Sequence, residues 1–237
     1  MGARKLFWDF LKGLDEKVRS AVEELGEEKA FHIIDVHVNA LLSLKSIVEN
    51  AYSPDELSRS LLFSCLDSIT TSFLWAQLAL LTRACQLAFR ELRWALELSC
   101  RSRLLDLLYP HDEPDRKLLK GLLLERRRRD VLPSGWRLVK KALGALQGLE
   151  LERDERLRVR RAWRELNRYV HAMPPSASYA EVADRLLGIS DVVSDVVLTL
   201  ALDAFPRARE GMAVSLSEEA LGRCLPMSYR YLRSHGS

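Results

Sequence analysis

Ser53–Leu108 reads SPDELSRSLLFSCLDSITTSFLWAQLALLTRACQLAFRELRWALELSCRSRLLDLL, and this segment is the strongest indication of the fold class. It opens with a helix-start signal: a Ser cap, Pro at the first helical position and an acid at the third. The apolar residues that follow recur at helical spacing, over a run that is long for one globular helix. We expect a break near Leu81–Ala84, with Thr82 as a candidate cap, and hence two antiparallel helices, the second stopped by Pro110 and Pro114.

Helical periodicity continues on both sides of this stretch, and strand-like alternation is almost absent. The further predicted helices are Lys5–Leu25, Glu28–Ala51, Arg116–Asp130, Trp136–Leu146, Leu151–Met173 and Ser178–Phe205. A last helix is expected in the tail from Ser215, bent or broken by Pro226. We therefore predict an all-α, up-and-down helical bundle in one domain, residues 1–237. It would comprise an N-terminal helical hairpin (1–51), a core bundle (53–205) and a C-terminal helical tail (215–237).

The composition is that of an ordinary globular protein, with 48% hydrophobic and 29% charged residues. The N-terminus lacks the apolar core of a signal peptide, and the longest apolar run, Ser72–Leu81, is too short to span a bilayer. These features predict a cytoplasmic protein that has no membrane partner. Scarce amides beside abundant charges are typical of hyperthermophile proteins.

The four cysteines are widely spread and include no CxxC pair. Cys65, Cys85 and Cys100 lie within apolar helical runs, where a reduced cysteine behaves as a small hydrophobic residue. We therefore expect buried thiols, including Cys224, rather than a disulfide or metal framework.

Positive charge is concentrated in one part of the chain. Arg116–Arg168 contains seventeen Lys or Arg against seven Asp or Glu, a local net charge of +10, while the whole chain carries +3. This asymmetry suits a basic face that meets phosphates, although a solvated surface of salt bridges would have the same composition. The candidate RNA-binding residues in this region are Arg126, Arg127, Arg128, Arg129, Arg160 and Arg161.

The helix predicted at Leu151–Met173 has two distinct faces at 100° per residue. Its expected core stripe consists of Val159, Trp163, Leu166, Val170 and Met173. Arg164, Arg168 and His171 cluster about 130° away, with Asn167 between the two groups. Arg164 and His171 are seven residues apart, so they share a face about 10 Å apart along the axis. This basic face should point away from the core of its own chain.

Arg164–His171, RELNRYVH, fits the R-x(4–6)-H pattern and resembles HEPN domains, the all-α bundles of many prokaryotic ribonuclease toxins and defence proteins. A closer resemblance is to an uncharacterised prokaryotic helical family with an LRxxxE element and a later YxxLSxxVH element. Leu92–Glu97, LRWALE, is similar to the first element. Trp163–His171, WRELNRYVH, is similar to the second, with Trp for Tyr and Asn for Ser. The similarity covers about Leu57 to Leu200.

The resemblance implies metal-independent RNA cleavage, without a cofactor, at the interface of a homodimer. Arg164 would clamp the phosphate, and His171 would move protons, as histidine can near neutral pH. Arg168 would add a phosphate contact and Asn167 would orient the other groups. The chain departs from the pattern at Glu165, where active HEPN ribonucleases usually carry a small polar residue.

Other interpretations of the same residues remain open. Arg164 could bridge to an acid on a neighbouring helix while His171 caps its own helix. The chain would then be a non-catalytic interaction protein, such as an antitoxin or an assembly subunit, or a nucleotide-binding bundle. The partners to consider are therefore RNA, a second copy of the chain and a protein antitoxin. Cleavage requires the Arg164 and His171 stripes of two copies to face each other or a shared cleft.

Three further groups need an interpretation. Arg93 and Glu97 are spaced i, i+4 and should form an ion pair in or beside the core, unless they reach across to orient His171. A metal interpretation of the polar group His32, Asp35, His37 and Asn39 is disfavoured, because residues five apart lie about 140° from one another on an α-helix. The tail residues Tyr229–Tyr231 should dock onto the bundle rather than stack on bases.

Overall fold

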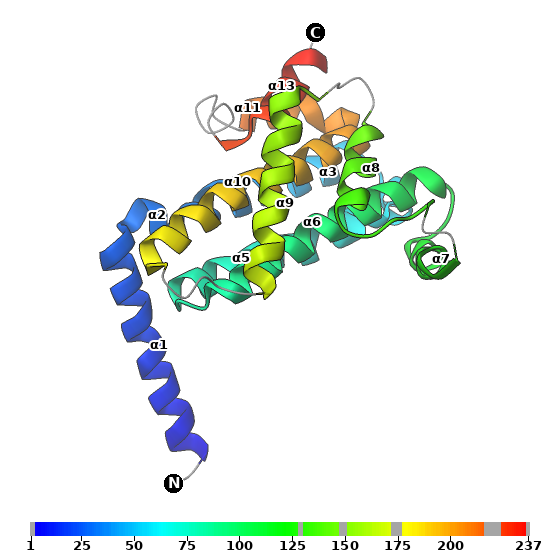
Figure 1. Cartoon of the computed structure of the whole chain (residues 1–237). Helices are drawn as coiled ribbons and strands as arrows, with labels where there is room; N and C mark the ends of the chain where they lie inside the picture. Colours follow the sequence, from blue (N-terminus) through cyan, green and yellow to red (C-terminus); the bar gives the residue numbers. More distant parts are fainter. Residues whose placement is uncertain (1–2, 128–129, 147–150, 172–176, 216–223, 236–237) are drawn as a thin grey trace.

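Two long helices form the centre of the molecule, α5 (Leu61–Leu81) and α6 (Cys85–Leu108). They are antiparallel and pack along their length (Figure 1). The turn between them contains Arg83 in the left-handed region, with φ 61°. The predicted break is confirmed, but Thr82 ends α5 rather than capping α6, because its hydroxyl donates to the carbonyl of Leu78. The computed structural model describes residues 3–127, 130–146, 151–171, 177–215 and 224–235.

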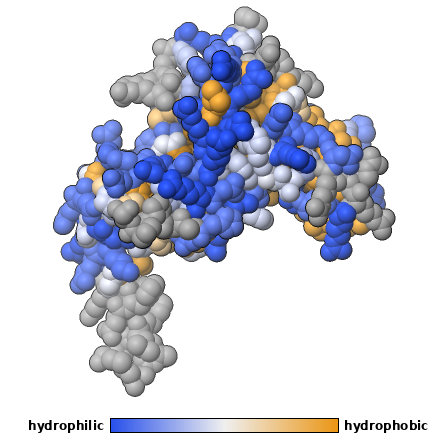
Figure 2. All heavy atoms as spheres, viewed as in Figure 1, coloured by the Kyte–Doolittle hydropathy of each residue, from blue (hydrophilic) through white to orange (hydrophobic). Residues whose placement is uncertain are grey.

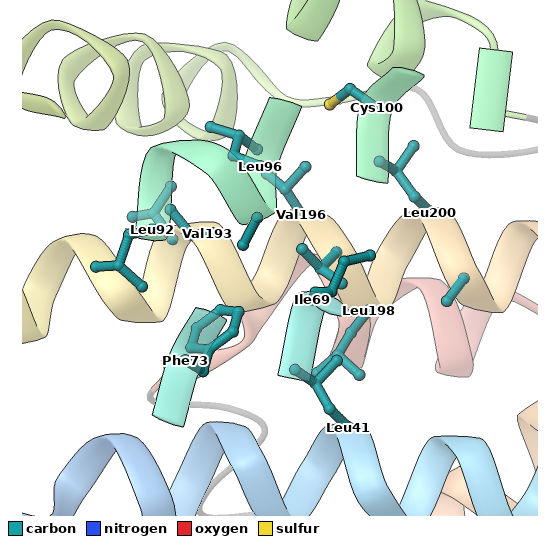
Figure 3. Close-up of a cluster of buried hydrophobic side chains, with 14 of the residues drawn as sticks. Leu41, Ile69, Phe73, Leu92, Leu96, Cys100, Val193, Val196, Leu198 and Leu200 are labelled. Carbon is teal, nitrogen blue, oxygen red and sulfur yellow. The ribbon is translucent and has the colours of Figure 1, made fainter. Parts of the chain in front are cut away.

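The helix α10 (Tyr179–Ala204) packs against α6 and is buried on nearly all sides from Ile189 to Asp203. Ser178 and Glu181 form a capping box at its start, close to the predicted boundary. One apolar core joins α10 to α3, α5 and α6 (Figure 3). Residues at the centre of this core are Leu41, Ile69, Phe73, Leu92, Leu96, Cys100, Val193, Val196, Leu198 and Leu200. The predicted all-α helical bundle is thus confirmed for the described part of the chain.

The N-terminal region begins with α1 (Ala3–Leu25), which projects away from the bundle (Figure 1). Gly26 then turns the chain with a φ of 80°, a conformation that favours glycine. We predicted one regular α-helix over Glu28–Ala51. Instead, α2 (Glu27–His32) and α3 (Asn39–Ala51) are joined by a π-helical segment, η1 (Ile33–Val38). Periodicity could not reveal this segment, because a π-helix in a short stretch leaves the apolar pattern on either side intact.

The helix that begins after Ser53 is also shorter than predicted. Ser53 and Glu56 form the expected capping box, but the helix they start, α4 (Pro54–Ser58), is short. A second cap begins α5, where Ser60 Oγ accepts a hydrogen bond from the backbone of Phe63. Asp106 of α6 accepts hydrogen bonds from the first two backbone N–H groups of α5. This long-range contact satisfies the helix start and explains why the chain restarts there.

Three helices follow the central pair: α7 (Pro114–Arg127), α8 (Trp136–Gly144) and α9 (Arg153–His171). All three lie where helices were predicted, within a few residues at the ends. Figure 1 shows α9 crossing the long helices at a steep angle, in contact with α6 and α10. This crossing exposes one whole side of α9 along its length.

The C-terminal region folds back onto α10 through η2 (Pro206–Ala208), α11 (Arg209–Ser215) and α13 (Pro226–His235). The predicted break at Pro226 is confirmed, because Cys224 is helical, Leu225 is not, and Pro226 is the first residue of α13, where its missing N–H costs no hydrogen bond. The predicted docking of the tail is confirmed, since Tyr231 is fully buried and its hydroxyl donates to Asp203. The buried Asp195 carboxylate accepts the backbone N–H groups of Met227 and Ser228 and so anchors the start of α13.

The apolar segments Glu27–Ala51 and Leu61–Leu81 are long enough, by length and composition, to cross a membrane. Their apolar windows are 39% and 50% buried within the fold, and core helices of soluble proteins meet the same criterion. The two segments are therefore weak evidence for a membrane protein. All four cysteines are thiols without a disulfide; Cys85 and Cys100 are buried as predicted, whereas Cys65 and Cys224 are only half-buried.

Candidate nucleic-acid interface

The sequence of α9 separates apolar and basic side chains onto opposite faces. The buried face consists of Val159, Ala162, Trp163, Leu166 and Tyr169. Tyr169 stacks on Phe89 of α6, with ring centroids 4.3 Å apart. Val170, predicted in the core stripe, is only half-buried, and Met173 lies outside the described residues. The predicted separation of α9 into a buried apolar face and an exposed basic face is otherwise confirmed. Because the apolar face is buried, the basic face must point outward.

Arg164, Arg168 and His171 are all exposed, and Asn167 is half-buried between them and the core. Neither Arg164 nor His171 makes a hydrogen bond or an ion pair with the described residues. The interpretation in which Arg164 bridges to an acid on a neighbouring helix therefore has no contact to support it. His171 is the last residue of α9. Both side chains can reach an external ligand without breaking an existing contact.

The exposed face of α9 carries more cations than the motif alone suggested. Arg153, Arg156, Arg160, Arg164 and Arg168 follow one another at intervals of three or four residues, so they lie on one side of the helix, and all five are exposed. We call these five residues the α9 ridge. With His171 at its end, the ridge spans about 27 Å at 1.5 Å per residue. Figure 2 shows strongly hydrophilic residues running along this part of the surface.

A groove of about 660 Å³ lies between α8 and the first half of the ridge. Among the described residues, its walls contain four cationic side chains, Lys140, Arg153, Arg156 and Arg160, and no acid. The remaining lining residues are Trp136, Leu143, Gly144, Leu151 and Leu157. A cationic groove with an apolar and aromatic wall suits a ligand that combines phosphates with flat bases.

The acidic residues described in this region lie off the ridge, with Asp154 on the opposite flank of α9. Glu152 and Glu155 pair with Arg230 of α13. Among the described residues, the one ion pair of Glu165 is with Arg185 of α10, at 4.0 Å. Glu165 also lines the opposite flank of α9, together with Arg161. The departure from the HEPN pattern at this position therefore places no carboxylate on the ridge.

The predicted Arg93–Glu97 ion pair is present, with Arg93 Nε 3.0 Å from Glu97 Oε1. The Arg93 guanidinium also lies over the Trp163 ring, 5.2 Å from its centroid. No contact joins either residue to His171 within the described part of the chain. The pair therefore supports α9 through Trp163 and does not orient His171 directly.

The structure brings together only some of the predicted RNA-binding residues. Arg160 lies on the ridge, whereas Arg161 lies on the flank beside Glu165. Arg126 is exposed on α7, which lies beyond α8 as seen from α9 (Figure 1). Of the other three arginines, Arg127 ends α7, and residues 128 and 129 lie outside the described residues.

Four groove residues were not predicted from the sequence: Trp136, Lys140, Arg153 and Arg156. The spacing of arginines along α9 could have predicted Arg153 and Arg156, but the groove itself is visible only once α8 packs beside α9. No protein-family model, curated protein or solved structure matches this chain.

Proposed function

We propose that this chain binds RNA along the α9 ridge and in the groove beside it. The observation that carries the proposal is the ridge itself, five exposed arginines on one side of a helix with no acid among them. Arginine binds phosphate through two parallel N–H donors, and successive cations about one helical turn apart can follow a phosphate backbone. Trp136 in the groove wall adds an aromatic surface of the kind on which unpaired bases stack.

The proposal extends to cleavage by Arg164 and His171 in a homodimer. In this step the imidazole of His171 takes the proton of a ribose 2′-hydroxyl, and the 2′-oxygen bonds to the adjacent phosphorus. The bond from phosphorus to the 5′-oxygen breaks, and the imidazolium of the second copy protonates that oxygen. Arg164 stabilises the negative charge on the phosphorane. The exposure of both side chains, with no partner among the described residues, supports this role.

The wider setting follows the resemblance of the R-x(4–6)-H segment. We place the chain in the cytoplasm, in a toxin, defence or stress system, with an antitoxin as a protein partner. Abundant charges and scarce amides favour a thermophilic source.

RNA binding is tested by fluorescence anisotropy with an end-labelled single-stranded RNA of mixed sequence. Arg156→Ala/Arg160→Ala removes two adjacent cations of the groove and should weaken binding at low salt. Lys17→Ala/Arg19→Ala is the matched control, since it removes the same charge from exposed positions of α1. The proposal is wrong if wild type does not bind, or if the control loses as much affinity as the ridge variant.

Cleavage is tested separately by incubating the RNA with the protein in EDTA, at moderate and at high temperature. We expect fragments with wild type and none with Arg164→Ala or His171→Ala. Fragments that persist in both variants would remove these residues from the reaction. Intact RNA with wild type, despite normal binding, would leave an RNA-binding protein that does not cleave under these conditions.

A second candidate function, a helical interaction protein, is favoured by the apolar surface of α7. Its exposed apolar residues are Leu118, Leu119, Leu122 and Leu123. Exposed leucines grouped on one helix are typical of a surface that another protein covers. A second copy is the first occupant to test, because the same leucine surface on two copies would be covered in a two-fold dimer. Light scattering coupled to size exclusion should show a dimer that Leu119→Lys/Leu122→Lys dissociates, while a monomeric wild type would exclude a second copy.

A further inference from the structure

The π-helical segment η1 changes the relation between His32 and His37. On a regular α-helix these residues would lie about 140° apart, and the metal interpretation was disfavoured for that reason. A π-helix closes its hydrogen bonds over five residues, so positions i and i+5 come together on one face. The two imidazole rings pack edge to face, with centroids 5.1 Å apart. Short π-helical insertions often occur at functional sites.

Both histidines converge on one carboxylate of α10. His32 Nε2 lies 2.7 Å from Asp191 Oδ1, and His37 Nε2 lies 3.0 Å from the same oxygen. His32 and Asp191 are each about one-fifth exposed, whereas His37 is fully buried. The outer part of the cluster is therefore accessible from solvent, and its inner part is held within the core.

Cys224 adds a sulfur atom to this cluster from the C-terminal region. Ligand atoms of His32, Asp191 and Cys224 all lie within 4.8 Å of one another. The Cys224 backbone is held in place, because its carbonyl accepts a hydrogen bond from Arg158, which also pairs with Asp195. Three segments that are distant in the sequence thus present nitrogen, oxygen and sulfur donors to one point.

We propose that His32, Asp191 and Cys224 bind one Zn²⁺ ion. A site with one imidazole, one carboxylate and one thiolate suits zinc, because magnesium and calcium require oxygen ligands. The charges of carboxylate and thiolate balance those of the divalent ion, so the occupied site is neutral and can remain half-buried. Donor atoms around tetrahedral zinc lie about 3.5 Å apart, which small side-chain rotations would achieve here. Water would occupy the fourth position.

His37 is a positioning residue in this site. It holds Asp191 from within the core, and Ser190 Oγ lies 3.2 Å from the same His37 nitrogen. Buried groups of this kind orient the ligands of metal sites. The ion would join α2, α10 and the segment before α13, and it would lie among residues distinct from the α9 ridge. Because the ion would lie apart from the ridge, chelation should leave RNA binding intact.

The first experiment is titration of the EDTA-treated and dialysed full chain with Zn²⁺, followed by a competing metal indicator and by thermal denaturation. We expect one equivalent of zinc to bind and to raise Tm. Cys224→Ser and His32→Gln should weaken binding beyond the roughly 10–100-fold typical of losing an outer partner. Cys65→Ser is the matched control, since Cys65 is also a half-buried thiol and should leave binding unchanged.

Substitution with Co²⁺ gives a second readout that does not depend on stability. Wild type should show a sulfur-to-cobalt charge-transfer band, which Cys224→Ser should lose while its circular dichroism stays helical. Absence of zinc binding by wild type, or unchanged binding in both ligand variants, would overturn the proposal. RNA anisotropy with and without zinc separates this outcome from failure of the RNA proposal.

Discussion

The dependence of RNA binding on salt tests the α9 ridge most directly. Each phosphate neutralised by the protein releases counterions, so the binding constant falls as the salt concentration rises. For single-stranded nucleic acid, the slope of log K against log salt concentration is about −0.7 for each phosphate contact. The ridge and the groove together offer six cations, the five ridge arginines and Lys140. Arg156→Ala/Arg160→Ala removes two of them and leaves four.

The six cations predict a slope of about −4 for wild type, and the four that remain predict about −3. Between 50 and 200 mM salt, wild type should then lose affinity by about 300-fold and the variant by about 50-fold. The two proteins should therefore differ most at low salt and converge as the salt concentration rises. A general loss of folding would instead lower affinity at every salt concentration.

The assay is anisotropy of labelled single-stranded RNA over a series of KCl concentrations, with the helical content of each protein checked by circular dichroism. Lys17→Ala/Arg19→Ala should keep the wild-type slope, because these exposed residues of α1 are remote from α9. Equal slopes for wild type and the Arg156→Ala/Arg160→Ala variant would show that the two arginines contact no phosphate and would contradict the proposed site.

Three further predictions concern stability and reactivity. Asp106→Ala should lower the free energy of unfolding in urea by about 3–5 kcal/mol, because it leaves the buried Lys117 without its carboxylate. The control Asp67→Ala breaks an exposed ion pair and should lower the free energy of unfolding by at most about 1 kcal/mol. Equal losses in the two variants would contradict this prediction. Burial raises the pKa of Asp195 to about 6, although its hydrogen-bond donors and Arg158 lower it in part. The Asp195 carboxyl group therefore binds a proton more tightly in the folded state than in the unfolded chain. Stability should therefore fall as pH rises from about 4 to about 6, relative to Asp195→Asn, and a relative gain over that range would mean that the donors outweigh burial. Burial raises the pKa of Cys85 to about 11 and also raises that of Cys100. Mass spectrometry should therefore find both thiols unmodified by iodoacetamide until the protein unfolds. Labelling of either cysteine in the folded protein would show that the core around it opens.

Much of the candidate site was predictable from periodicity. The apolar stripe of α9 around Trp163 and Leu166 requires Arg164, Arg168 and His171 to face outward, and the structure confirms that arrangement. The groove was not predictable, since it depends on where α8 packs. Arg160 and Arg161 were both predicted to bind RNA, but Arg160 lies on the ridge and Arg161 lies on its flank.

The cluster around Asp191 shows a different limit. The sequence suggested a polar group at His32 and His37, but regular α-helical geometry separated the two residues. The π-helical segment brings their rings together, and long-range packing adds Asp191 and Cys224. Neither contribution has a local signature, because both depend on how α2 meets α10 and the C-terminal region.

The helical class, most helix positions and the two faces of α9 were predictable from local sequence, since apolar periodicity and capping residues act within one helix. The restart of the chain at α5, the anchoring of α13 by Asp195 and the grouping of donors at Asp191 depend on packing between helices. These features depend on hydrogen bonds and ion pairs between residues far apart in the chain, such as Asp106 with the start of α5 and Asp195 with the start of α13. Such contacts form only when the helices pack, because a buried polar group requires a partner that local sequence does not supply.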